Sequence, residues 1–127
     1  MPLQTIICIK WGTRYGPEFV NRLASMIRRN TRRDTRLVCF TDDPAGLDPW
    51  IQTAPLPPFP NAPERVAWTP WRKISLWQHP LHDLSGDVLF FDLDVVITGS
   101  VDEFFDFEPG RYAVAENWTE PGKNIGN

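Results

Sequence analysis

Asp92 and Asp94 are the residues whose type and spacing most clearly suggest chemistry. They follow residues 88–91, four consecutive large apolar side chains that are typical of a strand covered on both faces in a parallel sheet. Two carboxylates at positions i and i+2 of a strand point to the same side, about 7 Å apart at Cα, and a bend would let both approach one cation. Mg²⁺ and Mn²⁺ prefer such oxygen ligands and keep positions open for water or phosphate. We therefore expect a metal–diphosphate site, the alternative being a strand-end turn with two solvated aspartates.

The aspartates belong to a longer pattern, DVLFFDLDVVITGSVDEFF, at residues 87–105. This segment resembles the Asp-x-Asp segment of GT-A glycosyltransferases, especially bacterial family 8-like enzymes, in which two aspartates hold the divalent cation that binds a nucleotide-sugar diphosphate. The resemblance continues through a turn at Gly99 into a short acidic and phenylalanine-rich helix. It implies an α/β, Rossmann-like GT-A fold with a mainly parallel sheet flanked by helices. It also implies Mn²⁺ or Mg²⁺ at Asp92 and Asp94, a nucleotide-sugar donor (a UDP-sugar by preference) and an acceptor that the sequence does not identify.

Lys73 is the basic residue that we expect beside the diphosphate, because the charge that develops on this leaving group must be neutralised. Similar transferases carry a basic residue on the helix before the Asp-x-Asp strand, and residues 71–76 occupy that place. The alternative is a solvated surface lysine. Indole rings stack on sugar faces, although core packing is the commoner role of tryptophan. The residues expected at the diphosphate or the sugar are Lys73, Trp71, Glu116 and Asn127.

The loop after the first predicted strand offers the aromatic face and the backbone groups that a nucleotide base needs. Tyr15 resembles the family tyrosine that stacks on uracil, and Leu93 would contribute mainly its backbone to the ribose. The other residues that we expect at the nucleotide are Lys10, Trp11 and Gly12. The family carries small polar residues in this loop, so the identity of the base stays open.

One part of the family's metal site has no counterpart in the chain. The third metal ligand of the family is a histidine near the C-terminus, whereas His79 and His82 have no metal-ligand spacing with the aspartates. No residue of the sequence can be assigned as catalytic.

Hydrophobic spacing predicts the elements that must position these residues. Residues 5–9 and 36–40 are apolar runs that predict two strands, the first of them central in the sheet. Between them, Pro17 begins a helix with apolar residues at helical spacing and a basic last turn. The three elements form a βαβ unit, which should be parallel and right-handed. Residues 41–46 then favour a turn in which Asp42 or Asp43 caps backbone amides rather than contacting a ligand.

The remaining predicted elements are an edge strand at 50–53, a stiff proline-rich loop at 54–63, a helix over 69–77 and a further strand at 112–115. Thr69 is expected to cap that helix, with Pro70 at its first position. We expect a single nucleotide-sugar-binding domain over residues 1–127. Residues 116–127 are loop-like, and in the family the corresponding segment leads into an acceptor-binding half, so we expect a fold that is incomplete at its C-terminus.

Composition limits the classes of partner. The 127 residues are 42% hydrophobic and 23% charged, as in an ordinary globular domain, and the formal charge of -3 argues against a nucleic-acid partner. No apolar run approaches the roughly 20 residues of a membrane span, and no signal sequence opens the chain. We expect a cytoplasmic protein in which Cys8 and Cys39 are reduced. An apolar face prepared for the acceptor half should also favour a homo-oligomer.

Two other functions remain open at this point. Haloacid-dehalogenase-like phosphatases also carry an apolar run followed by Asp-x-Asp, with one aspartate as nucleophile and the next as acid or base. In that family the motif normally opens the chain, and its later motifs would have to follow in the short tail after Asp94. The third candidate is a nucleotide-binding module without catalysis, which would bind UDP with metal but neither transfer nor hydrolyse a sugar.

Overall fold

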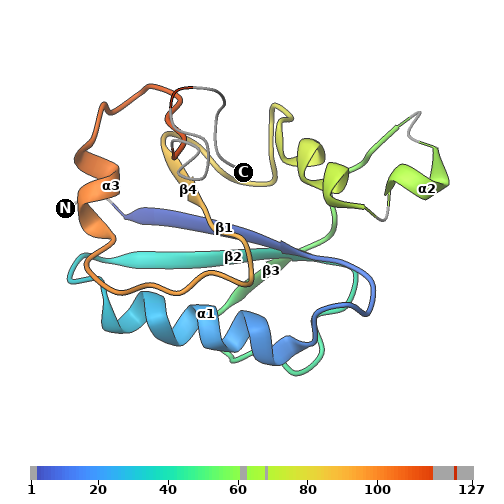
Figure 1. Cartoon of the computed structure of the whole chain (residues 1–127), viewed down its shortest axis with the longest axis horizontal. Coiled ribbons are helices and arrows are strands. Elements are labelled where there is room, and N and C mark those ends of the chain that lie inside the picture. Colours follow the sequence, from blue (N-terminus) through green and yellow to red (C-terminus); the bar gives the residue numbers. More distant parts are fainter. Residues whose placement is uncertain (1–2, 61–62, 68, 116–121, 123–127) are drawn as a thin grey trace.

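A four-stranded parallel sheet, in the order β3-β2-β1-β4, forms the centre of the computed structural model, which describes residues 3–60, 63–67, 69–115 and 122 (Figure 1). The strands are β1 (Gln4–Lys10), β2 (Thr35–Thr41), β3 (Gln52–Ala54) and β4 (Val88–Phe90). The helices are α1 (Pro17–Arg29), α2 (Glu64–Ala67), the 3-10 helix η1 (Pro70–Leu76) and α3 (Asp102–Asp106). The prediction of an α/β fold with a parallel sheet is confirmed.

The predicted β1-α1-β2 unit is present, and its two strands are parallel. β1 and β2 stay in register over their whole length, from Gln4 opposite Thr35 to Lys10 opposite Thr41. Within this register Cys8 lies opposite Cys39, and both are buried free thiols. The hydrogen bond with Cys39 and burial both raise the pKa of Cys8 well above its usual value.

Helix α1 covers one face of the sheet. Pro17 is its first residue, where a missing backbone N–H costs nothing, and Glu18 in the first turn suits the helix dipole. The helix buries five side chains: Val20, Leu23, Ala24, Met26 and Ile27. They pack against the β1 side chains of Ile6 and Cys8 and against their neighbours on β2. This apolar stripe at helical spacing is the pattern on which the sequence prediction rests.

The opposite face of the sheet has a smaller core. Ile7, Ile9 and Phe40 are buried there, and Leu76 of η1 packs on them together with Leu81. The predicted helix over 69–77 is therefore present, although as a 3-10 helix. Figure 1 shows α1 on one side of the sheet and η1 on the other.

The strand before the aspartates is shorter and more peripheral than predicted. β4 pairs only with β1, from Val88 opposite Thr5 to Phe90 opposite Ile7, and no other described strand pairs with it. Val88 is 41% exposed. The prediction that residues 88–91 form a strand covered on both faces is wrong, because the strand ends at Phe90 and its first residue is exposed.

The apolar residues after Phe90 belong to an extended segment, interrupted by a turn at Leu93 and Asp94, that crosses to the α1 side of the molecule (Figure 1). Every second side chain, those of Phe91, Leu93, Val95 and Ile97, packs against the α1-side core, whereas Val96 between them is exposed. The segment is fixed at both ends by its backbone: the Phe91 amide donates to the Ile7 carbonyl (3.1 Å) and the Ile97 amide to Met26 Sδ (3.4 Å). This alternation of buried and exposed side chains reflects packing over α1 and not pairing within the sheet.

Three further predictions can be compared with the structure. The edge strand predicted at 50–53 is present as β3. Residues 112–115 do not form the predicted strand, and all four are exposed. Of the predicted tail at 116–127, only Gly122 lies within the described residues. No described helix has the length and apolarity needed to cross a membrane.

Candidate functional site

The loops that follow β1, β2 and β4 meet at one edge of the sheet, because parallel strands place their carboxyl ends together. Two of these loops are joined directly, since the Gly12 amide donates to Asp42 Oδ2 (3.1 Å). Gly12 has a positive φ of 64°, a conformation that glycine adopts without strain. Asp43 accepts from the Ala45 amide (3.0 Å). The predicted role of Asp42 or Asp43 in the turn is thus confirmed.

Asp92 and Lys73 form an ion pair at this edge. Lys73 Nζ lies 2.5 Å from Asp92 Oδ1, with the two side chains 35% and 27% exposed. Alternation along the chain places Asp92 on the same side as Phe90, and the ammonium of Lys73 also lies 5.9 Å from the centre of the Phe90 ring. Helix η1 packs on this side of the sheet, which is how it brings Lys73 to the carboxylate. The structure therefore joins the predicted metal ligand to the predicted basic residue.

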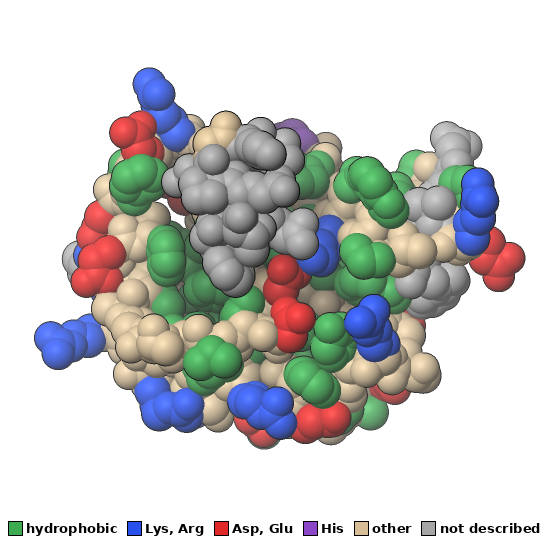
Figure 2. Space-filling model, in the orientation of Figure 1, with side chains coloured by type: hydrophobic (Ala, Val, Ile, Leu, Met, Phe, Trp, Pro, Cys, Tyr) green, Lys and Arg blue, Asp and Glu red, His purple; other side chains and the backbone are tan. Residues whose placement is uncertain are grey.

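Asp94 lies in a different environment. The chain turns at Leu93 and Asp94, Leu93 is buried in the α1-side core, and Asp94 is exposed. The motif thus presents one paired and one solvated carboxylate. Figure 2 shows acidic and basic side chains meeting near the centre of this face, bordered by apolar ones.

The carboxylates of the motif suit a hard cation that takes its remaining ligands from water and from a substrate. Within the described ranges, no three or more His, Cys, Asp or Glu side chains are grouped to hold a metal ion. Mg²⁺ is commonly bound by one or two carboxylates, with waters and phosphate oxygens filling its other positions. Asp92 and Asp94 fit that pattern if a metal ion replaces Lys73 as the partner of Asp92.

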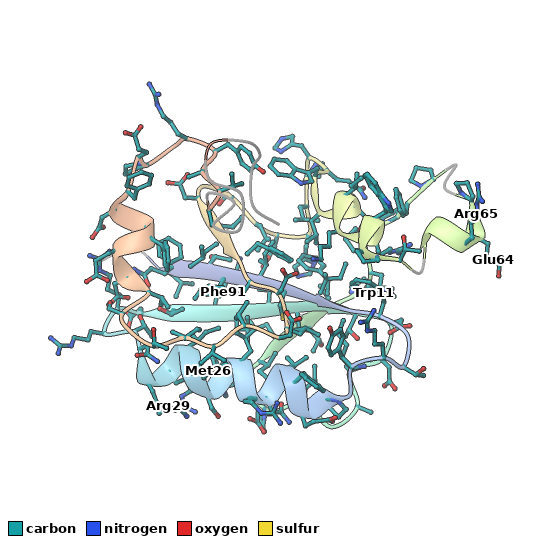
Figure 3. All side chains as sticks on the ribbon, viewed as in Figure 1. Trp11, Met26, Arg29, Glu64, Arg65 and Phe91 are labelled. Carbon is teal, nitrogen blue, oxygen red and sulfur yellow. The ribbon has the colours of Figure 1, made fainter. Side chains whose placement is uncertain are left out.

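The residues expected at the nucleotide base are not all on one side of the sheet. Trp11, at the carboxyl end of β1 in Figure 3, packs on the η1-side core, whereas Tyr15 packs on the α1-side core. The Tyr15 ring contacts Phe19 edge to face at 4.9 Å between ring centres, and the guanidinium of Arg14 lies 5.7 Å from its centre. The structure thus brings Lys73 to Asp92 but does not join Trp11 and Tyr15 in one aromatic pocket.

The predicted sugar ligands have separate outcomes. Trp71 is 64% exposed on η1, so core packing does not account for it, and its contact with a sugar stays a prediction. Glu116 and Asn127 lie outside the described residues. The exposed Trp77 and Tyr112 meet edge to face with 5.0 Å between ring centres, a pair that no sequence signal pointed to.

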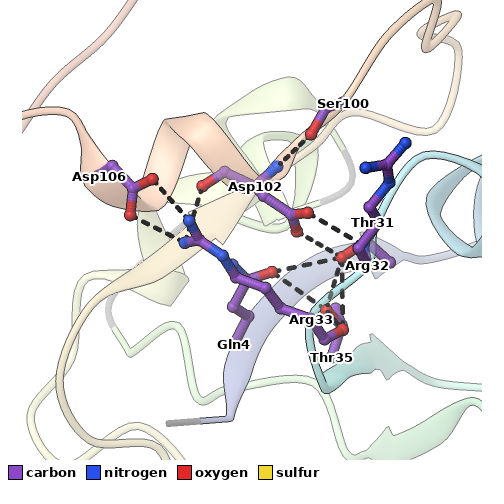
Figure 4. A network of polar contacts seen from close by, with 8 residues as sticks. All are labelled: Gln4, Thr31, Arg32, Arg33, Thr35, Ser100, Asp102 and Asp106. Carbon is purple, nitrogen blue, oxygen red and sulfur yellow. Dashed lines mark hydrogen bonds and ion pairs between the residues drawn. The ribbon is translucent and has the colours of Figure 1, made fainter. Parts of the chain in front are cut away.

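A polar network at the opposite, amino edge of the sheet was missed by the sequence prediction (Figure 4). Asp102 is buried there and accepts hydrogen bonds from Thr31 Oγ1 (2.5 Å) and from the Arg32 amide (3.0 Å). Arg33 binds Asp106 through both guanidinium nitrogens, at 2.8 and 2.7 Å. Burial by itself would raise the pKa of Asp102, but these hydrogen bonds and the charge of Arg33 outweigh it and hold the pKa below its usual value.

This network has a structural role that serves the motif indirectly. It ties α3 to the α1–β2 connection and so fixes the far end of the extended segment that begins at the aspartates. The signal that could have found it is the complementarity between the basic residues at 32–33 and the acidic ones at 102–106.

Comparisons with protein-family models, with curated proteins and with solved structures find no match to this chain. The function must therefore be inferred from the arrangement of its residues.

Proposed function

We propose that the chain is the nucleotide-sugar-binding domain of a metal-dependent glycosyltransferase of the GT-A type, which binds a UDP-sugar and transfers the sugar to an acceptor not yet identified. The observation that supports this proposal is the ion pair between Lys73 and Asp92, with the exposed carboxylate of Asp94 two residues further on. A metal–diphosphate site requires two carboxylates for the metal ion and a nearby cation for the diphosphate. Lys73 can serve as that cation once a metal ion has taken its place at Asp92.

The strand order supports the Rossmann-like part of the proposal. In the order β3-β2-β1-β4 the direction of winding reverses between β1 and β4. Ligands of doubly wound sheets bind at the carboxyl edge next to such a reversal. Asp92 follows β4 and Lys10 ends β1, so both residues lie at the position that this rule favours for a ligand.

Charge accounts for the roles of the site residues. Asp92 and Asp94 would hold Mn²⁺ or Mg²⁺, and the bound ion would supply electrostatic stabilisation of the diphosphate as it leaves the sugar. Lys73 would release Asp92 and donate to a phosphate oxygen instead, a charge-assisted hydrogen bond. The exposed indole of Trp71, two residues before Lys73 on η1, would then lie on the same side of the sheet as the sugar.

The test is thermal stabilisation by UDP in the presence of Mn²⁺. Ligand at 100 times its dissociation constant should stabilise the fold by about 2.7 kcal/mol. Asp92→Asn and Asp94→Asn should remove this increment, and an excess of chelator should remove it from the unmodified chain. Asp34→Asn, at an exposed residue on the opposite edge of the sheet, is the matched control and should keep it.

Equal binding of UDP in excess chelator would contradict the role of the metal. Sugar transfer or hydrolysis is then measured as UDP release from a panel of UDP-sugars, with and without candidate acceptors. Phosphate release from an aryl phosphate without UDP binding would instead identify a phosphatase, and metal-dependent UDP binding without turnover would identify a binding module.

A further inference from the structure

Lys10 is a buried cation without a partner in the described part of the chain. It is the last residue of β1, an interior strand, and only 5% of its surface is exposed. The described residues give its ammonium no hydrogen bond and no ion pair, and the nitrogen keeps only a small contact with solvent. Lys73, in contrast, is already paired with Asp92.

Such a lysine is unfavourable for the fold of the free protein. Removing an ammonium group from water costs free energy that only a hydrogen-bonded or charged partner offsets. The position next to Lys10 on β2 is Thr41, whose hydroxyl is engaged with the backbone of Asp43. The nearby turn carboxylate of Asp42 accepts from the Gly12 amide. A methionine would fill the same strand position without the cost of burying a charge.

The position of Lys10 indicates what could offset this cost. Alternation places its side chain on the α1 face with Ile6 and Cys8, whereas Asp92 and Lys73 meet on the η1 face. The two lysines thus approach the carboxyl edge between β1 and β4 from opposite sides. A ligand seated on that edge would have a cationic group on each side of it.

We propose that the ammonium of Lys10 binds a phosphate group of the donor, an inference that rests on the proposed function. Phosphate is the favoured anion because it carries several acceptor oxygens. A lysine ammonium offers three N–H donors to these oxygens and a compact positive charge. Gly12, two residues further on, turns with positive φ and has no side chain to hinder the approach of the ligand to the backbone. Lys10 is the preformed anion site, since Lys73 stays paired with Asp92 until a metal ion arrives.

The experiment uses Lys10→Met with inorganic pyrophosphate and UDP as probes, in metal-free buffer, followed by calorimetry and thermal unfolding. We expect pyrophosphate to bind the variant at least tenfold more weakly than the unmodified chain, while the ligand-free variant unfolds at a higher temperature. Arg65→Met, at an exposed cation of α2, is the matched control, and it should bind pyrophosphate as the unmodified chain does. A ligand-free Lys10→Met that melts at a lower temperature with unchanged pyrophosphate affinity would overturn the proposal, because Lys10 would then be structural.

Two outcomes separate this inference from the proposed function. If pyrophosphate binding depends on Lys10 but UDP binds neither with nor without Mn²⁺, the phosphate site stands and the donor assignment fails. If UDP binds through Asp92 and Asp94 with Mn²⁺ and Lys10→Met changes neither probe, the phosphate site fails and the donor assignment stands.

A measurement on the unmodified chain covers the case in which the variant does not fold. The sequence has three lysines, Lys10, Lys73 and Lys123, so their side-chain ammonium signals can be resolved by nitrogen-15 NMR. Pyrophosphate should shift the signal of Lys10. A shift confined to the other two would refute the assignment.

Discussion

Replacing Lys73 by methionine should change the affinities for the metal and for the nucleotide in opposite directions. In the free protein the lysine ammonium occupies Asp92 Oδ1 at 2.5 Å, the position that a cation would need. A metal ion must therefore displace the lysine before it can use that oxygen. Lys73→Met removes this competition and also removes the group that we expect to donate to the diphosphate.

The exposure of the pair sets the size of the first effect. With the two side chains 35% and 27% exposed, solvent screens the pair strongly, and an ion pair of this kind contributes about 1 kcal/mol at most. Since 1.4 kcal/mol corresponds to a factor of ten, Mn²⁺ should bind Lys73→Met up to about fivefold more tightly without nucleotide. A hydrogen bond to a charged group contributes about 1.5–3 kcal/mol, so UDP with saturating Mn²⁺ should bind roughly tenfold more weakly or worse.

Free Mn²⁺ can be followed by its paramagnetic resonance signal, and UDP binding by calorimetry. Arg65→Met is the matched control, because Arg65 is an exposed cation on α2 whose side chain lies at the far end of the molecule in Figure 3. It should leave both affinities unchanged. If Lys73→Met binds Mn²⁺ no more tightly than the unmodified chain, the lysine does not compete with the metal and the reasoning is refuted.

Two predictions concern the parts of the fold that hold the motif. Because the pKa of Asp102 is lower in the folded chain than in the unfolded one, its contribution to stability is present above the unfolded pKa and is lost as pH falls through the folded one. Asp102→Asn should therefore cost about 1–3 kcal/mol at pH 7, and urea titrations should show the difference shrinking below roughly pH 4; a difference independent of pH would contradict the ionised role. Leu93→Ala should cost about 2–5 kcal/mol of unfolding free energy, whereas Val96→Ala, at an exposed position of the same segment, should stay within about 0.5 kcal/mol; similar costs would contradict the alternating packing.

Local patterns predicted the half of the fold in which neighbouring elements pack on one another. Apolar runs and a helical stripe suffice for β1, α1 and β2, since each element meets the next one along the chain. They fail after Phe90, because a continuous apolar run fits a strand covered on both faces as well as a short strand followed by a segment that lies over a helix. The position of α1 and the contact between Ile97 and Met26 distinguish the two structures, and both depend on the tertiary fold.

The sequence predicted which residue types would lie at the candidate site. It did not predict which of their charges are paired and which are buried. The expectation that Lys73 and Asp92 serve the same diphosphate needed only the family pattern, whereas their direct pairing depends on how η1 docks. Lys10 shows the opposite difficulty, because a lysine that ends a strand is normally solvated and its burial cannot be read from its neighbours in sequence. The Asp102 network joins residues about 70 positions apart, which no local pattern records.

The burial of Leu93 has a consequence for how affinity and thermal stability depend on each other. Its side chain fills the α1-side core, while its backbone joins the two carboxylates of the motif. A cavity opened in the same core by Leu23→Ala on α1 would loosen the motif without touching any charged group. Hydrogen exchange at the Ile97 amide, which donates to Met26 Sδ, would report that loosening directly. A ligand that bridges Asp92 and Asp94 should in turn slow that exchange, so that α1 and the carboxyl edge of the sheet open as one cooperative unit.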